Sequence, residues 1–138
     1  MIEKANLEVF AATLLDLAKK DKDIIVVTSD SRGSGKLTNF GKELPDQIIE
    51  VGIAEQNLVG ICAGLSSAGK KVFGVSPSSF LTARSLEQIK NDIAYSDVYW
   101  GYGWINHRRN ESNSCITIGK ICCTGNPSNA SLQSDTSC

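Results

Sequence analysis

The run Ile24-Ile25-Val26-Val27 limits the fold of this chain more than any other feature, because it is short, continuous and β-branched. Such a run is typical of a strand buried on both faces, as in a parallel sheet covered by helices on both sides. The segment before it predicts one of these helices. Its apolar residues recur at helical spacing: Leu7, Phe10, Ala11, Leu14, Leu15 and Ala18.

Helical and strand patterns continue to alternate along the chain. Residues 47–51 and 71–76 read as strands, and residues 36–43 and 54–68 as helices, with a further helix starting at 77–79. This order predicts an α/β protein of three layers, with a mostly parallel sheet flanked by helices. Ligands bind at the carboxyl ends of the strands in such folds. The loops 30–35, 52–55 and 76–80 are therefore expected at the binding edge.

The composition changes near residue 98. The later segment holds both tryptophans, the only histidine and most of the cysteines, but only five of the charged residues: Arg108, Arg109, Glu111, Lys120 and Asp135. It shows no sustained period and is rich in Ser, Asn, Thr and Gly. We therefore predict a folded domain at 1–98, followed by a loop-rich or disordered segment at 99–138.

The overall composition excludes several classes of function. A chain of 138 residues with a net charge of −1 has no basic excess for nucleic acid or an anionic membrane. No apolar stretch is long enough to span a bilayer. Met1-Ile2-Glu3-Lys4 does not resemble a secretory signal, so we expect a cytoplasmic protein with reduced thiols.

The sequence predicts neither a metal centre nor a phosphate loop. Cys122 and Cys123 are adjacent, no CxxC pair occurs, and His107 is the sole imidazole. Gly33-Ser34-Gly35-Lys36 lacks the spacing of a P-loop.

Glu55 is the residue most able to carry chemistry, because it stands where a strand and a turn lead into an apolar helix. It is either an acid that suits the first turn of a helix or a buried partner for a heterocycle. Burial favours the neutral form of a carboxyl more strongly than a helix dipole favours its charged form. Asp30 reads as a turn residue or a site residue, Phe80 as a core or a site aromatic, and Arg84 as a solvated surface residue.

The run Val51-Gly52-Ile53-Ala54-Glu55-Gln56-Asn57 resembles the pyrimidine-binding domain of thiamine-diphosphate enzymes of the transketolase type. The resemblance extends from Leu7 to Val98. It includes Val27-Thr28-Ser29-Asp30 and the segment from Ser78 to Gln88. It implies the carboxy-terminal section, or a separate subunit, of a transketolase with an incomplete thiamine-diphosphate-binding fold.

The resemblance also implies roles for single residues. Glu55 is expected to hydrogen-bond N1′ of the cofactor's aminopyrimidine and to promote its imino tautomer. Asp30, Ile53 and Phe80 are expected to help bind the cofactor, with Phe80 packing on the pyrimidine. The family often has another aromatic three residues after this phenylalanine, where this chain has Ala83.

The same resemblance implies that the diphosphate-binding half of the cofactor site lies outside this chain. The Gly-Asp-Gly and Asn pattern that holds magnesium in the diphosphate-binding domain does not occur here, so magnesium and the diphosphate are expected on a partner chain or domain. A small-residue face on the helix over 54–68 is a candidate contact surface: Gly60, Ala63, Gly64 and Ser67. We expect an oligomer that transfers a two-carbon ketol unit between sugar phosphates, and no activity from this chain alone.

Other readings stay open from the sequence. The chain is also compatible with part of a deoxyxylulose-phosphate synthase, with the β subunit of a 2-oxoacid dehydrogenase, or with a non-catalytic interaction module. The segment after residue 98 departs from the family. If the gene is read one base further on, the codons for Trp100 to Glu111 can encode a Gly-rich stretch, and those for Asn113 to Cys115 can encode Thr-His-Ala. This possibility suggests a frameshift. A sheet cut short there would expose an unpaired edge and favour self-association.

Overall fold

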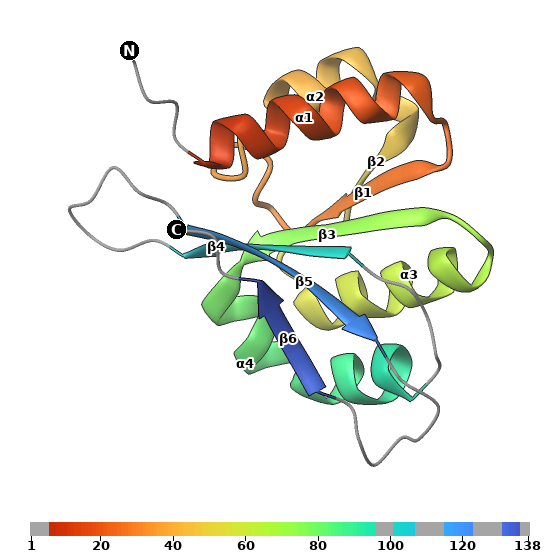
Figure 1. Cartoon of the computed structure of the whole chain (residues 1–138), viewed down its shortest axis with the longest axis vertical. Helices are drawn as coiled ribbons and strands as arrows, with labels where there is room; N and C mark the ends of the chain where they lie inside the picture. Colours follow the sequence, from red (N-terminus) through yellow and green to blue (C-terminus); the bar gives the residue numbers. More distant parts are fainter. Residues whose placement is uncertain (1–5, 96–100, 107–114, 123–130, 136–138) are drawn as a thin grey trace.

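The computed structural model of the chain describes residues 6–95, 101–106, 115–122 and 131–135. The first of these ranges alternates helices and strands (Figure 1): α1 (Asn6–Lys20), β1 (Ile24–Thr28), α2 (Thr38–Glu43), the 3-10 helix η1 (Pro45–Gln47), β2 (Ile48–Glu50), α3 (Glu55–Ser67), β3 (Lys71–Pro77), α4 (Ser78–Gln88) and the π-helix η2 (Ile89–Ala94). The element order expected from the sequence is therefore confirmed over this part of the chain.

The strands form one sheet in the order β2-β1-β3-β4-β5-β6. Strand β1 pairs in parallel with β2 on one side and with β3 on the other, with Val26 opposite both Ile48 and Phe73. The β-branched run thus occupies the interior of the sheet, where hydrogen bonds run to both neighbours. Parallel pairing places the carboxyl ends of the first three strands at one edge, as the sequence predicted.

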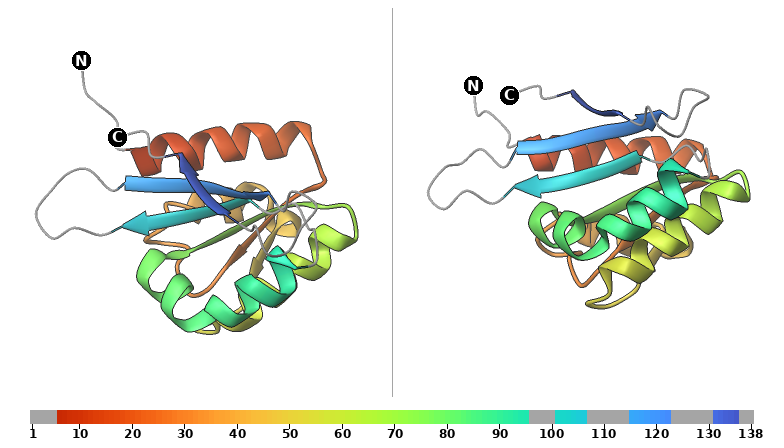
Figure 2. Two further views of the ribbon diagram at one scale, coloured as in Figure 1. Left: turned by 60° about the horizontal axis from the view of Figure 1, so that its bottom comes forward. Right: turned by 90° about the horizontal axis from the view of Figure 1, so that it is seen from below.

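Helices cover both faces of the sheet, with α1 and α2 on one side and α3 and α4 on the other (Figures 1 and 2). Alternate residues of β1 enter separate cores, since Val26 packs beneath α1 and α2 while Val27 packs against α3 and α4. Both side chains are fully buried. The predicted α/β class with helices flanking a mostly parallel sheet is confirmed.

The segment predicted to be loop-rich contains three further strands: β4 (Gly101–Asn106), β5 (Cys115–Cys122) and β6 (Ser131–Asp135). Strand β4 pairs in parallel with β3, and β5 and β6 follow in antiparallel order. The edge of β3 is therefore paired, which differs from the open edge that we expected. The reason is that β3 offers a full row of backbone donors and acceptors, and Tyr102, Trp104 and Ile105 give β4 aromatic and β-branched residues that favour a strand.

Helix α4 is not regular. Ser85 lies inside it with φ −122° and ψ 22°, outside the helical region, and the π-helix η2 follows. Irregular turns of this kind inside a helix occur frequently at functional sites. Within the described ranges, no helix is long and apolar enough to cross a membrane.

Candidate functional site

Glu55 is the first residue of α3, and its carboxylate is buried with a relative exposure of 4%. The burial follows from helical spacing. Leu58 and Val59 lie three and four residues further on, and both pack into the core beside β1 and β3. Glu55 therefore lies on the same buried face of α3 as Leu58 and Val59. A carboxylate on a buried stripe needs a partner that compensates for its lost hydration.

A tight turn sets the position of this helix start. Gly52 follows β2 with φ +70°, which glycine adopts without steric cost. The carbonyl of Gly52 accepts the N–H of Ala54 at 2.8 Å, and the N–H of Val51 donates to the carbonyl of Thr28 at 3.0 Å. The second contact connects the turn to the end of β1. Together they fix Glu55 at the carboxyl edge of the sheet.

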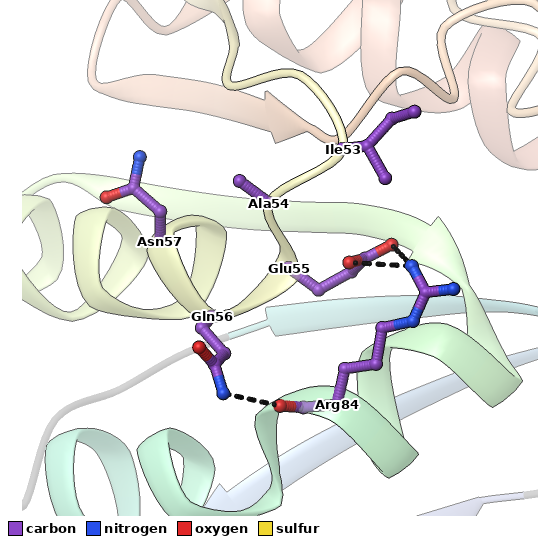
Figure 3. Close-up of a pocket in the computed structure, with 6 residues that line it drawn as sticks. All are labelled: Ile53, Ala54, Glu55, Gln56, Asn57 and Arg84. Carbon is purple, nitrogen blue, oxygen red and sulfur yellow. Dashed lines mark hydrogen bonds and ion pairs between the residues drawn. The ribbon is translucent and has the colours of Figure 1, made fainter.

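Arg84, in α4, is the partner of Glu55 (Figure 3). Its Nη1 lies 3.2 Å from each carboxylate oxygen of Glu55. The guanidinium carbon also lies 4.2 Å from the centre of the Phe80 ring. Arg84 lies at the surface as predicted, with its side chain 48% exposed, but the prediction missed that it pairs with a buried carboxylate.

The backbone of Arg84 is also held. Gln56 donates from Nε2 to the Arg84 carbonyl at 3.0 Å (Figure 3). The irregular residue Ser85 comes next, and its hydroxyl donates to the Leu81 carbonyl. The start of α3 and the middle of α4 are therefore joined by a side-chain ion pair and a separate hydrogen bond to the backbone.

A cleft of about 600 Å³ lies at this point. It is lined by the residues that Figure 3 draws: Ile53, Ala54, Glu55, Gln56, Asn57 and Arg84. Ile53 is 76% exposed, the highest value among the exposed large apolar side chains of the described residues. The cleft thus combines an exposed apolar wall with one buried acid, a combination that suits a flat, partly polar ligand.

Asp30 and Phe80, the other residues predicted for the site, are not among the residues that line the cleft. Asp30 follows β1 directly after Ser29, is exposed, and has φ +49°. Its N–H donates to Oε1 of Glu50 at 2.6 Å. Phe80 lies in the first turn of α4 and is 44% exposed. It reaches the cleft through Arg84, which covers its ring.

Two more contacts order the same edge of the sheet. Ser29 donates from its hydroxyl to Oγ of Ser76 at 2.7 Å, and both side chains are buried. Oε1 of Glu50 accepts the N–H of Gly52 at 3.1 Å in addition to that of Asp30. Sequence reasoning missed Glu50. Its place at the end of a strand, immediately before a glycine turn, is the signal that could have pointed to it.

The chemistry available here is that of a buried carboxylate with a half-exposed counter-ion. A buried acid beside an open cleft can accept a hydrogen bond from a ligand or exchange a proton with it. Among the described residues, no group of three or more His, Cys, Asp and Glu is placed to hold a metal ion.

Comparison with known proteins identifies the family. Residues 3–105 match the family model described as the pyrimidine binding domain of transketolase. A relative from Phocaeicola vulgatus, one of the subunits of an apulose-4-phosphate transketolase, is 61% identical over 87 residues, which cover 63% of this chain and 28% of that protein. A 1-deoxy-D-xylulose-5-phosphate synthase from Clostridium kluyveri is 42% identical over 87 residues, covering 62% of this chain and 14% of the relative.

A solved structure, described as a split gene transketolase forming an inactive beta4 tetramer, superposes with a TM-score of 0.63 and 35% sequence identity. The match covers 70% of this chain and 32% of that one. The chain therefore spans less than a third of each of these three proteins. The family match includes all of the first three strands and every residue of the cleft. The chain belongs to the transketolase pyrimidine-binding domain family.

Proposed function

We propose that the chain is the pyrimidine-binding half of a transketolase that uses thiamine diphosphate. The observation that carries this proposal is the buried Glu55 carboxylate at the start of α3, facing an open cleft at the carboxyl edge of the sheet (Figure 3). An acid in that place suits a ring nitrogen of a heterocycle, because a neutral or proton-sharing carboxyl can donate as well as accept.

The side chains present fit the pyrimidine end of this cofactor. An aminopyrimidine is flat, apolar on its faces and polar at its edges. The cleft provides the exposed Ile53 for a face and Glu55 for an edge, and Phe80 offers an aromatic ring next to it. Asp30 follows β1 at the same edge of the sheet, and we assign it to the rim of the site. When bound, thiamine diphosphate supplies the carbon nucleophile of two-carbon transfer.

Each of these residues then has a defined task. Glu55 holds or moves a proton at N1′ of the ring, which is the catalytic contribution of this chain. Ile53 and Phe80 position the ring and exclude water from the edge that Glu55 contacts. The small-residue face of α3 is the proposed contact with the partner. Gly60 and Gly64 on that face have no atom within 4 Å of the position that a Cβ would take.

The proposed reaction is the transfer of a two-carbon ketol unit between sugar phosphates, in the cytoplasm. The diphosphate and magnesium are assigned to a separate diphosphate-binding subunit or domain, so that this chain has no turnover by itself. The proposal is supported by the relative from Phocaeicola vulgatus, which is named as a transketolase subunit.

A second candidate function is a fragment of a 1-deoxy-D-xylulose-5-phosphate synthase, which the 42% identity to the protein of Clostridium kluyveri favours. The two candidates share the pyrimidine site and differ in the donor of the two-carbon unit. A transketolase takes the unit from a ketose phosphate, whereas the synthase takes it from pyruvate, which releases CO2; both pass it to an aldose phosphate. Substrate panels on the reconstituted complex distinguish them.

The experiment is reconstitution. The full chain is mixed with a transketolase diphosphate-binding subunit, thiamine diphosphate and magnesium, and ketol transfer is measured for the mixture and for each component. We expect activity only in the mixture, and its loss by at least about 100-fold with Glu55→Gln. Glu87→Gln, an exposed change on α4, is the matched control and should retain activity. A complex that forms but has no activity would favour the non-catalytic module.

A further inference from the structure

Arg84 makes both contacts that the proposed ring would need. Its guanidinium pairs with the Glu55 carboxylate, and the same planar group lies over the face of Phe80. We propose that the Arg84 guanidinium occupies the place of the incoming pyrimidine, so that it is a displaceable counter-ion of Glu55 rather than a permanent one. This inference rests on the proposed function, because the displaced contact is the one that binds the ring.

The geometry of the ion pair favours release. A single nitrogen, Nη1, serves both oxygens of Glu55 at 3.2 Å. A charge-assisted bond is usually about 2.7–2.9 Å long, and the strong arginine–carboxylate arrangement uses two nitrogens in parallel. The pair is therefore long and served by one nitrogen. It compensates for the buried charge of Glu55 without the strength of a bidentate clamp.

The contact between Arg84 and Phe80 occupies a ring face that the pyrimidine would also use. The guanidinium carbon lies 4.2 Å from the centre of the Phe80 ring, close enough for a cation–π interaction. A guanidinium is flat and bears N–H donors at its edge, as an aminopyrimidine does. The two groups therefore compete for the face of Phe80 that Arg84 covers and for the positions at the carboxylate that Nη1 occupies.

The backbone allows the side chain to leave without disturbing α4. The Arg84 carbonyl is held by Gln56, and Ser85 takes up the irregular dihedral angles directly after it. The side chain is 48% exposed, so solvent is already next to the guanidinium. Displacement then requires only rotations within the side chain. Once Arg84 has left, the oxygens of Glu55 that Nη1 occupied can hydrogen-bond the edge of the ring.

The test uses the full chain and 4-amino-5-hydroxymethyl-2-methylpyrimidine, the pyrimidine half of thiamine, as the probe. Affinity is measured by ligand-observed NMR titration. Removing the competitor with Arg84→Gln should tighten binding about fivefold, since a half-exposed ion pair and a cation–π contact no longer have to be broken. Arg84→Lys keeps the charge but not the planar group, so its gain should be smaller. Lys42→Gln, an equal change of charge on exposed α2, should have no effect.

A second readout needs no variant. In the ¹⁵N-labelled chain, the Arg84 Nε–Hε resonance should move as the probe saturates the site. Equal or weaker binding by Arg84→Gln, or a resonance that stays in place at saturation, would overturn the inference. Glu55→Gln distinguishes a failure of the proposed function from a failure of the displacement of Arg84 alone. If it binds the probe as well as the unmodified chain, the proposed function fails. If it loses the probe while Arg84→Gln does not tighten binding, only the displacement by Arg84 fails.

Discussion

The carboxylate of Glu50 accepts the backbone N–H of Asp30 at 2.6 Å, across a separation of 20 residues. The same oxygen accepts the N–H of Gly52 at 3.1 Å. Both donors belong to residues with positive φ, 49° and 70°. One exposed acid thus joins the loops that follow β1 and β2, and one of these loops leads directly into Glu55.

Replacing Glu50 should loosen both loops. Glu50→Ala removes the shared acceptor, and water then competes for the two N–H groups. We expect amide hydrogen exchange at Asp30 and Gly52 to accelerate about tenfold, which corresponds to one lost hydrogen bond to a charged group. Glu87→Ala, on the exposed side of α4, is the control. Unchanged exchange at both amides would show that Glu50 does not hold the loops.

Two glycines that are equally free of steric contact should respond in opposite ways to alanine. A Cβ at Gly52 or at Gly60 would meet no atom within 4 Å, but only Gly52 has a left-handed φ. Gly52→Ala should therefore destabilise the chain by about 1 kcal/mol. Gly60→Ala, inside α3, should stabilise it by about 0.5–1 kcal/mol. Urea denaturation gives both values.

The Gly60→Ala variant also tests the proposed contact surface. If the small-residue face of α3 meets a partner, an added methyl group obstructs the close approach of the two chains. The variant should then be more stable alone and form the complex more weakly. Unimpaired assembly, measured by size-exclusion chromatography with the diphosphate-binding subunit, would remove this face from the interface.

Gln47 should be important for stability. Its side chain is buried, and Nε2 lies 3.2, 3.1 and 2.9 Å from the carbonyls of Ala18, Asp21 and Ile24. Its side chain therefore connects the end of α1 to the start of β1. Gln47→Leu removes this side-chain donor from the three carbonyls and should cost about 2 kcal/mol in unfolding free energy. Gln56→Leu, which removes one exposed hydrogen bond, should cost less than about 1 kcal/mol.

Asp21 and Lys71 predict a dependence of stability on pH. The hydrogen bond from Lys71 at 2.6 Å, with a smaller effect of the Asp23 N–H, lowers the pKa of the Asp21 carboxyl. A lowered pKa contributes stability above the ordinary value, which is lost as the pH falls through the lower folded value. The difference in urea midpoint between the unmodified chain and Asp21→Asn should therefore shrink below about pH 4.

The contribution of Lys71 to stability should depend on pH in the opposite direction. The hydrogen bond to Asp21 raises the pKa of its ammonium group. A raised pKa contributes stability below the ordinary value, and this is lost as the pH rises through the folded value, above about pH 10. Lys71→Gln should thus match the unmodified chain most closely at the alkaline end. A difference that does not depend on pH for either variant would contradict the assignment of the pair.

The sequence was sufficient for what depends on local periodicity. The β-branched run of β1 and the apolar stripe of α1 repeat at the strand and helix periods, and both elements form where these patterns predict them. The acid at the start of α3 was found in the same way. A turn followed by an apolar helix is visible in the residues themselves.

The partner of that acid was not visible, because Glu55 and Arg84 are 29 residues apart and belong to different helices. Their meeting depends on how α3 and α4 pack on the sheet and on the irregular Ser85, and no local pattern encodes either of these. The strands after residue 98 were missed for a related reason. Pairing with a neighbouring strand supplies much of the stabilisation of such strands. A prediction from the residues of one segment alone therefore underestimates them.

The place of β1 between β2 and β3 has a consequence for synthesis of the chain. Both partners of β1 follow it closely along the chain, β2 ending at Glu50 and β3 at Pro77. The first three strands can thus pair while the later codons are still being translated. The strands that frame Glu55 are therefore synthesised before the segment that pairs at the outer side of β3.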